Sequence, residues 1–234
     1  MAQKINPSIA ALAADIQAQV LAAKDRSVPT LRTIRRAATR RLKSSQPVEV
    51  VRLALHLLST EQVPRWFVYE LVHHHRAAVS SLTEAQLRKL GKGVSSWGQV
   101  DTFACYLSGP AWREGQISDK VVHGWAVSSD RWWRRVALVS TVALNMTARG
   151  GRGDAKRTLV VCEIVMTDRD DMVVKALSWA LRALASKEPD AVREFLESND
   201  DRLAARVVRE VHNKLKTGLK NPRRAAQQQP PRRG

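Results

Sequence analysis

Apolar residues recur at intervals of three and four along almost the whole chain, and this spacing restricts the fold more than any other feature. It places the apolar side chains on one face of an α-helix, whereas the alternation typical of strands is hardly present. The sequence therefore predicts an all-α protein. The expected helices cover residues 7–24, 28–43, 47–59, 62–79, 83–93, 96–108, 117–127, 130–146, 155–167, 170–186, 188–197 and 199–216.

The breaks between these helices contain residue types that begin and end helices. Pro64 stands near an expected start, and Asp130 and Asp170 stand where their side chains would cap a first turn. Gly109-Pro110 is expected to lie in a connection. These features predict a series of short helices joined by short loops.

Short helices in series favour a stack of helical pairs, and one short pattern recurs along the chain. Its alanines, Ala54, Ala137 and Ala176, are separated by about 80 and about 40 residues, which fits HEAT-like helical pairs. The same pattern also suits the inner helix of any packed hairpin. We expect residues 1–219 to form a single HEAT-like helical-repeat domain, an α-solenoid with a concave basic surface. Residues 220–234 are expected to form a disordered basic tail.

The charge balance points to a polyanionic partner. Lys and Arg number 39 against 22 Asp and Glu, and only five of the basic residues lie in 220–234, so the helical part is itself basic. Nucleic acid is the usual partner of such a surface, and an anionic membrane is the lesser alternative. The chain contains neither a secretory signal pattern nor a long apolar window, which predicts a cytoplasmic protein that does not span a membrane.

The densest basic segment is 26–43, in which seven basic residues occur without an acid. Arg32, Arg36 and Arg40 are four apart and would form one ridge on a helix, suited to phosphates along a duplex. A solvated helix face is the alternative. Because like charges on one helix repel each other, we favour a phosphate partner.

Metal, redox and cofactor chemistry find little support in the sequence. Cys105 and Cys162 stand in apolar helical segments and are expected to be buried, without a disulfide. His73, His74 and His75 are consecutive, so on a helix they point about 100° apart and cannot all bind one metal ion. No metal and no cofactor are therefore expected.

Seven tryptophans are many beside two tyrosines and three phenylalanines, and several stand next to arginines. A tryptophan in a helical array is most often part of the core, but Trp beside Arg also suits a surface that holds nucleotides. Trp97 and Asp101 are four apart and would share one helix face. The alternative for Asp101 is an ion pair with a nearby arginine.

Four segments together resemble a known family, the HEAT-like-repeat DNA alkylpurine glycosylases of the AlkD type, which are DNA alkylation repair enzymes. The resemblance extends over about residues 25–217, and Pro189 to Val192 followed by Phe195 continues it. The segments are Val28 to Arg32, Ser96 to Asp101, Ser129 to Ala137 and Val174 to Arg182.

The resemblance implies the residues of a site. Trp97, Asp101 and Trp179 would line the concave surface where damaged DNA lies and carry the catalysis, and Arg135 would contact the DNA backbone. Further DNA contacts are expected from Arg134, Trp132, Lys175, Arg32, Arg36 and Arg40.

The resemblance also implies an activity. Such an enzyme would hydrolyse the N-glycosidic bond of cationic purines alkylated at N3 or N7, such as 3-methyladenine and 7-methylguanine, in double-stranded DNA. The lesion would not be flipped into a deep pocket, and the product would be an abasic site, formed without a lyase step, a metal or a cofactor. A monomer in the bacterial cytoplasm, associated with the nucleoid, is expected.

Two other classes of function remain open. A non-catalytic HEAT-repeat protein could hold duplex or branched DNA with the same basic surface. A repeat scaffold could bind an acidic protein partner. Asp101 separates the enzyme from the pure DNA-binding protein, because only hydrolysis would require its carboxylate.

Overall fold

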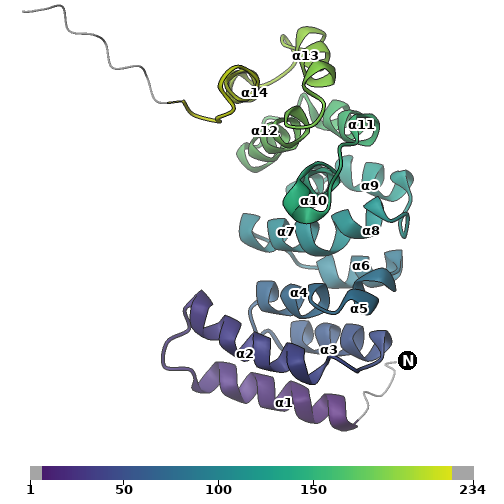
Figure 1. Ribbon diagram of the computed structural model, residues 1–234, viewed down its shortest axis with the longest axis vertical. Coiled ribbons are helices and arrows are strands. Elements are labelled where there is room, and N and C mark those ends of the chain that lie inside the picture. The colour runs from purple at the N-terminus through teal and green to yellow at the C-terminus, as the bar shows by residue number, and fades with distance from the viewer. Residues whose placement is uncertain (1–6, 223–234) are drawn as a thin grey trace, which may run out of the picture.

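The computed structural model describes residues 7–222, and this part of the chain is helical with no strand, so the prediction of an all-α fold is confirmed. Figure 1 shows the helices stacked along the long axis of the molecule, with the N-terminal pair at one end. Most of the predicted basic tail lies outside the described residues. The helices are α1 (Pro7–Ala22), α2 (Val28–Arg41), α3 (Pro47–Thr60), α4 (Arg65–His73), α5 (Arg76–Ser80), α6 (Glu84–Gly91), α7 (Trp97–Phe103), the π-helical turn η1 (Ala104–Ser108), α8 (Gly109–Arg113), α9 (Asp119–Ala126), α10 (Arg131–Asn145), the 3₁₀ turn η2 (Thr147–Arg149), α11 (Ala155–Val165), α12 (Asp171–Ala185), α13 (Pro189–Glu197) and α14 (Ala205–Thr217).

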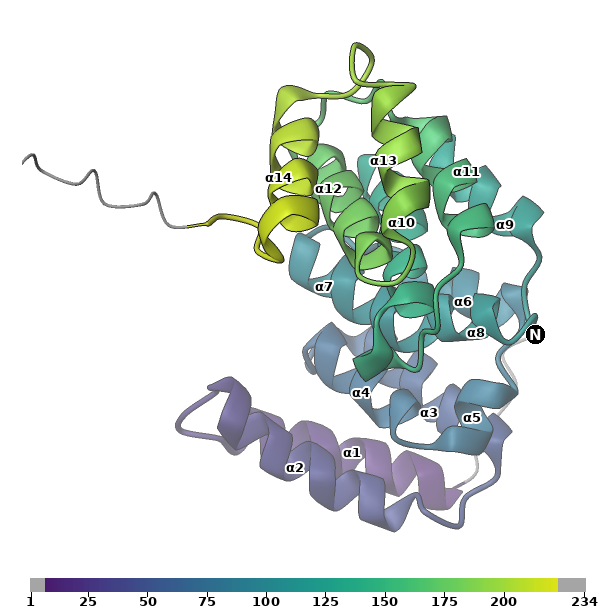
Figure 2. The ribbon, with the colours of Figure 1, turned by 45° about the horizontal axis from the view of Figure 1, so that its top comes forward.

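The helices form two layers. In the first layer α2, α4, α7, α10, α12 and α14 follow one another, each in contact with the next. In the second layer α1 packs on α3 and α3 on α6, and further along α9 packs on α11 and α11 on α13. Figure 2 shows the two layers side by side in the C-terminal half. A continuous apolar core separates them, as in an array whose helical pairs bury their apolar faces against their neighbours.

Several predicted boundaries are correct and three are wrong. Asp130 and Asp170 cap α10 and α12 as expected, accepting the amides of Trp132 at 2.8 Å and Met172 at 2.9 Å. The helix predicted over 62–79 is broken, because His75 leaves the helical conformation and its Nδ1 caps α5.

The other two wrong boundaries lie further along the chain. Gly109-Pro110 was expected in a connection, but it continues the helix after the π-helical turn η1. Pro110 is tolerated there because it stands in the first turn of α8. The amide hydrogen that proline lacks would have little part in helical hydrogen bonding at that position. The last helix begins at Ala205 instead of 199, because the chain before it turns so that Leu203 is buried.

The two cysteines are free and buried, as the sequence predicts. Burial raises the pKa of the Cys105 thiol to about 12, so this side chain behaves as a small apolar group. Within residues 7–222, none of the helices combines the length and the apolar character that a membrane span requires.

Candidate nucleic-acid interface

A two-point ion pair in the first layer joins Asp101 of α7 to Arg135 of α10. Nε and Nη2 of Arg135 donate to the two carboxylate oxygens of Asp101, each at 2.9 Å. The third guanidinium nitrogen, Nη1, donates to the backbone carbonyl oxygen of Met172 at the start of α12. One arginine therefore ties three successive helices together and fixes the direction of the Asp101 carboxylate.

The carboxylate of Asp101 lies at the edge of the protein interior. Its side chain is 18% exposed, whereas that of Arg135 is 6% exposed. Burial raises the pKa of Asp101, and the hydrogen bonds and charge of Arg135 oppose this rise. A carboxylate that is oriented and still accessible is available to a ligand on this surface.

Local sequence explains how α7 presents this group. Ser96 is extended and its hydroxyl accepts the amide of Gln99, which starts the helix at Trp97. Val100 faces the core and is fully buried. Because helical positions four apart share a face, Trp97 and Asp101 then lie on the same side of α7. The segment Ser96 to Asp101 thus encodes a cap, an aromatic, a core anchor and a carboxylate.

The tryptophans divide between the core and the surface. Trp112 is fully buried, and its Nε1 donates to Asp119 at 2.8 Å. The side chain of Trp97, by contrast, is 62% exposed. Trp179 is half-buried and lines a hollow of about 500 Å³ together with Arg182 and Lys214. Trp97 and Trp179 are thus available for contacts with a ligand, whereas Trp112 is not.

Most of the predicted DNA-contacting side chains already have a protein partner. Nε of Arg134 donates to Asp168 at 2.7 Å, and Arg32 is paired with Glu70 at 2.7 Å. Lys175 is paired with a neighbouring aspartate of α12. These contacts show what positions the side chains, and DNA binding by them stays a prediction.

The remaining predicted contacts are less constrained. Arg36 and Arg40 of α2 are exposed, and neither has a carboxylate partner in the described part of the chain. Trp132 is half-buried beneath Arg131, whose guanidinium carbon lies 4.9 Å from the ring centroid. Arg135, which was expected to contact the DNA backbone, has a buried guanidinium that holds Asp101, and its contact with DNA stays a prediction.

A second carboxylate is held in a similar way, and it was not among the residues predicted from the sequence. Glu70 of α4 is buried and accepts hydrogen bonds from Arg32 and Arg35 of α2. Trp66 stands four residues before it, and the guanidinium carbon of Arg32 lies 5.6 Å from the Trp66 ring centroid. The spacing of Trp97 and Asp101 is therefore repeated one first-layer helix earlier, and that repeat was the signal in the sequence that could have found it.

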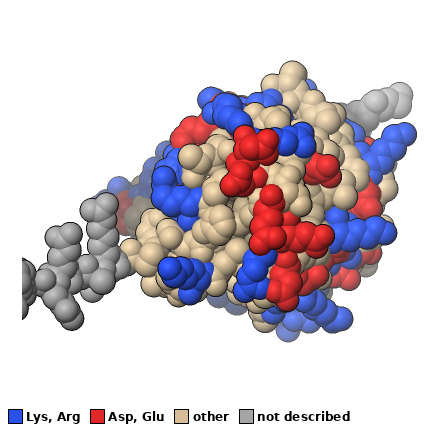
Figure 3. All heavy atoms as spheres, turned by 90° about the horizontal axis from the view of Figure 1, so that it is seen from above, with Lys and Arg blue, Asp and Glu red and all other residues tan. Residues whose placement is uncertain are grey.

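Charge is unevenly distributed over the molecule. Figure 3 shows the C-terminal end of the stack with acidic side chains across its middle and basic ones around them. The hollow beside Trp179 instead carries Lys187, Lys214 and Lys220. This hollow is therefore lined by cations from α12 and α14 and from the segments that follow them.

A protein-family model described as DNA alkylation repair enzyme matches residues 12–215, which is most of the chain. A search of curated individual proteins finds no match.

Proposed function

This chain belongs to the family of DNA alkylation repair enzymes, and we propose on that premise that it is a DNA glycosylase. Its substrates are cationic purines alkylated at N3 or N7 in duplex DNA, such as 3-methyladenine and 7-methylguanine. One observation carries the proposal: the Asp101 carboxylate is held in a fixed direction by Arg135, remains accessible, and shares a helix face with an exposed tryptophan.

The chemistry needs little more than this group. Alkylation leaves the purine positively charged, so when the bond between N9 and C1′ breaks, the electron pair passes to N9 and the base leaves as a neutral molecule. No general acid is required. Positive charge then develops on the sugar, and a water molecule adds to C1′ and releases one proton.

Asp101 suits both demands of that step. Its negative charge stabilises positive charge at C1′ when the two lie close together. Arg135 occupies one lone pair on each carboxylate oxygen, and two remain for hydrogen bonds to the attacking water. Because Arg135 fixes the carboxylate before DNA binds, orienting it costs nothing during the reaction.

The two accessible indoles act on the same charges. The face of an indole ring attracts a cation, so Trp97 and Trp179 stabilise the alkylated base or the sugar by cation–π contact. Their contribution is binding and charge stabilisation, without proton transfer. This role accounts for the exposure of Trp97.

A second function is favoured by the same ion pair. An aspartate that joins α7 to α10 through Arg135 has a structural reason to be present even in a protein that does no chemistry. A non-catalytic protein for duplex or branched DNA would keep this tie, and it would lose little affinity for DNA when Asp101 is neutralised.

The test is base release from a duplex with a single 7-methylguanine, detected by alkaline cleavage at the abasic site. We expect release by the natural protein and a loss of about 100-fold or more in Asp101→Asn. The matched control is Asp168→Asn, which removes charge from another Arg–Asp pair of the stack and should keep most of the activity.

Two results would contradict the proposal. One is release by Asp101→Asn at the natural rate. The other is no release by the natural protein from duplexes containing 7-methylguanine or 3-methyladenine while duplex binding is intact, which would favour the non-catalytic protein. Thermal unfolding of both variants checks that the difference does not arise from lost folding.

A further inference from the structure

A hollow of about 740 Å³ lies where α4 ends, beside η1 and η2, and we call it the histidine hollow. It takes its side chains from segments far apart in the sequence. Those that matter here are His73, His74, Arg76, Cys105, Arg113 and Arg149.

The charges in the histidine hollow are mostly uncompensated. Arg76 and Arg149 have no carboxylate partner among the described residues. The carboxylate of Glu114, which also lines the hollow, accepts Nε of Arg113 at 2.8 Å. Arg113 is further engaged by the carbonyl oxygen of Ala143. The free positive charge therefore belongs to Arg76 and Arg149.

Arg149 is also held in place. Its guanidinium carbon lies 4.4 Å from the ring centroid of Tyr106, and the His73 ring stacks on the same tyrosine at 4.3 Å. Two groups this close to one ring centroid must occupy opposite faces. The guanidinium thus keeps its hydrogen-bond donors while its orientation is restricted, which favours recognition of an anion.

The positive surface continues from the histidine hollow toward α2. A smaller hollow of about 380 Å³ shares His74 and Arg76 with it and adds Arg40 and Lys43 from the C-terminal end of α2. Neither Arg40 nor Lys43 has a carboxylate partner in the described range. The two hollows together form a path of cations that runs from Arg149 of η2 over Arg76 of α5 to the C-terminal end of α2.

This path begins next to the candidate site. Cys105, which lines the histidine hollow, follows Asp101 by four residues in the helical segment that runs from α7 into η1. Four residues of an α-helix rise about 6 Å along the helix axis. Phosphates of one DNA strand recur about every 3.4 Å along a duplex, so phosphates near a nucleotide at Asp101 come within reach of the hollow.

We propose that the histidine hollow binds backbone phosphates of the DNA strand next to the nucleotide held at Asp101, and that the strand continues over Arg40 and Lys43. The inference rests on the proposed function in one respect, the position of the lesion at Asp101. Recognition of phosphate by Arg76 and Arg149 does not require that any base be released.

Protonation of the two histidines is coupled to this binding. Burial lowers the pKa of His73, and the charges of His74 and Arg149 lower it further. A hydrogen bond with the backbone of Tyr106 and the charge of Glu70 raise it in part. Burial also lowers the pKa of His74, with Arg35, Arg32 and Arg36 acting the same way and Glu70 opposing them.

Both imidazoles are consequently neutral in the free protein at pH 7. A bound phosphate favours the charged form of each, so binding takes up protons and affinity rises as the pH falls.

The deciding experiment is a scan in which single phosphates of a duplex are replaced by neutral methylphosphonates, on the strand that carries 7-methylguanine. Binding is measured with Asp101→Asn protein, so that base release does not interfere. We expect affinity to fall about 5- to 20-fold at one or two positions on one side of the lesion. The double variant Arg76→Gln/Arg149→Gln should bind the duplex without methylphosphonates more weakly. Methylphosphonates at the sensitive positions should no longer lower its affinity.

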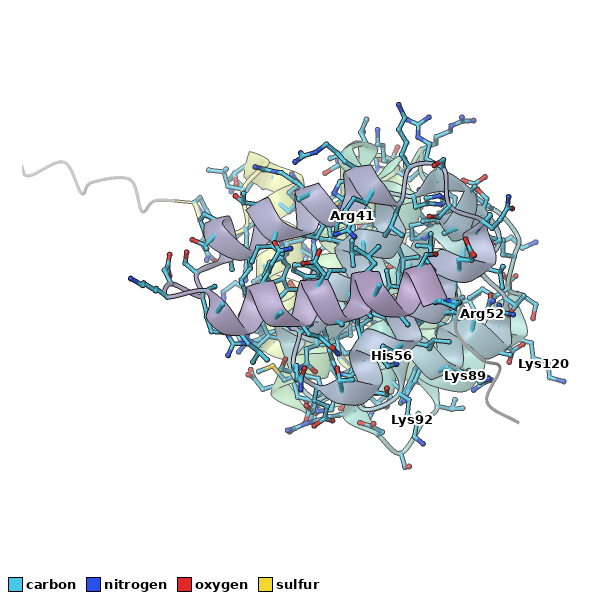
Figure 4. The ribbon with its side chains drawn as sticks, turned by 90° about the horizontal axis from the view of Figure 1, so that it is seen from below. Arg41, Arg52, His56, Lys89, Lys92 and Lys120 are labelled. Atoms are coloured by element: carbon cyan, nitrogen blue, oxygen red, sulfur yellow. The ribbon has the colours of Figure 1, made fainter. Side chains whose placement is uncertain are left out.

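The control variant is Lys89→Gln, which removes an exposed cation of the second layer that is labelled in Figure 4. It should leave the methylphosphonate profile unchanged. Arg149→Lys keeps the positive charge, so it should bind the duplex with most of the affinity that Arg149→Gln loses. This comparison separates the effect of charge from that of packing against Tyr106. In His73→Gln/His74→Gln the rise in affinity between pH 7.5 and 6 should be lost.

The proposal is overturned if the scan is flat, or if the sensitive positions persist in the double arginine variant. Binding of inorganic phosphate in the hollow together with a flat scan would also overturn it, since the site would then serve a free anion. Absence of base release by the natural protein, with a position-specific scan, would reject the glycosylase and leave the phosphate site standing.

Discussion

The hydrogen bonds from Arg135 to Asp101 determine the charge of the carboxylate as well as its direction. Burial raises the pKa of Asp101, and Arg135 opposes that rise. If the ionised form is needed for base release, activity falls as the pH drops through this pKa. Under the proposed function, Arg135 then extends the pH range of base release toward acid.

Arg135→Gln tests this relation. Removal of the guanidinium leaves the effect of burial unopposed, so the pKa of Asp101 rises and the acidic limb of the rate profile moves to higher pH. The measurement is base release against pH, corrected for spontaneous loss of the alkylated base. An acidic limb that stays in place would show that another group controls it. We also expect the free energy of unfolding to fall by about 2 kcal/mol.

The sequence predicted that Trp97 and Asp101 share a helix face, but not that Asp101 is held by Arg135. Trp97 and Asp101 could be placed together because spacing by four is a local property of a helix. The partner of Asp101 could not be identified, because Arg135 is 34 positions away and its approach depends on how α7 packs against α10. The proximity of an arginine was open as an alternative, without a way to choose which one.

At the scale of elements, the contact between α8 and α10 depends on a residue without a side chain. A Cβ on Gly109 would lie 2.6 Å from the Cβ of Ala143 and 2.7 Å from the carbonyl oxygen of Ser140. Both neighbours belong to α10, which carries Arg135 one to two turns earlier. Close packing at Gly109 therefore helps to set the position of the guanidinium.

Two glycine substitutions separate packing from helix propensity. Gly109→Ala should destabilise the protein by about 1–3 kcal/mol, because α10 must move away. Gly98→Ala adds the same methyl group in α7, where nothing lies within 4 Å, and should stabilise the helix by about 0.5 kcal/mol. Chemical denaturation measures both, and equal losses in the two variants would contradict this account.

Helix boundaries show where local sequence information ends. The caps at Asp130 and Asp170 were predicted correctly because a cap involves only three or four neighbouring residues. The continuation of the helix through Pro110 was not, because it depends on the π-helical turn before it and on contact with α10. A Gly-Pro pair on its own is typical of a break.

At the scale of the molecule, carboxylates that are buried or mostly buried join the first-layer helices. Arg35 of α2 is bound to Glu70 of α4, and Arg135 binds Asp101 between α10 and α7. Between α12 and α14, the hydroxyl of Ser178 donates to Glu210 at 2.6 Å. In an array of this kind each contact stabilises mainly the helices beside it.

Glu70→Gln should therefore open one end of the molecule only. Arg35 is left buried without a counter-charge, which costs about 3 kcal/mol at this junction. Hydrogen exchange should become faster in α1 and α2 while α10 and α12 keep their protection. Glu84→Gln, at an exposed pair with Arg88, is the matched control and should change little. Faster exchange throughout the chain would show that the stack unfolds as a single unit.

The arginine that spans three helices has a consequence for protein engineering. Asp101 owes its direction to Arg135, and Arg135 is itself anchored on the backbone of Met172. Transplanting a loop, or the helix that bears the carboxylate, would carry over the acid without its orientation. The smallest portable unit of this site is the trio α7, α10 and α12, so a graft onto a designed helical scaffold has to import all three helices.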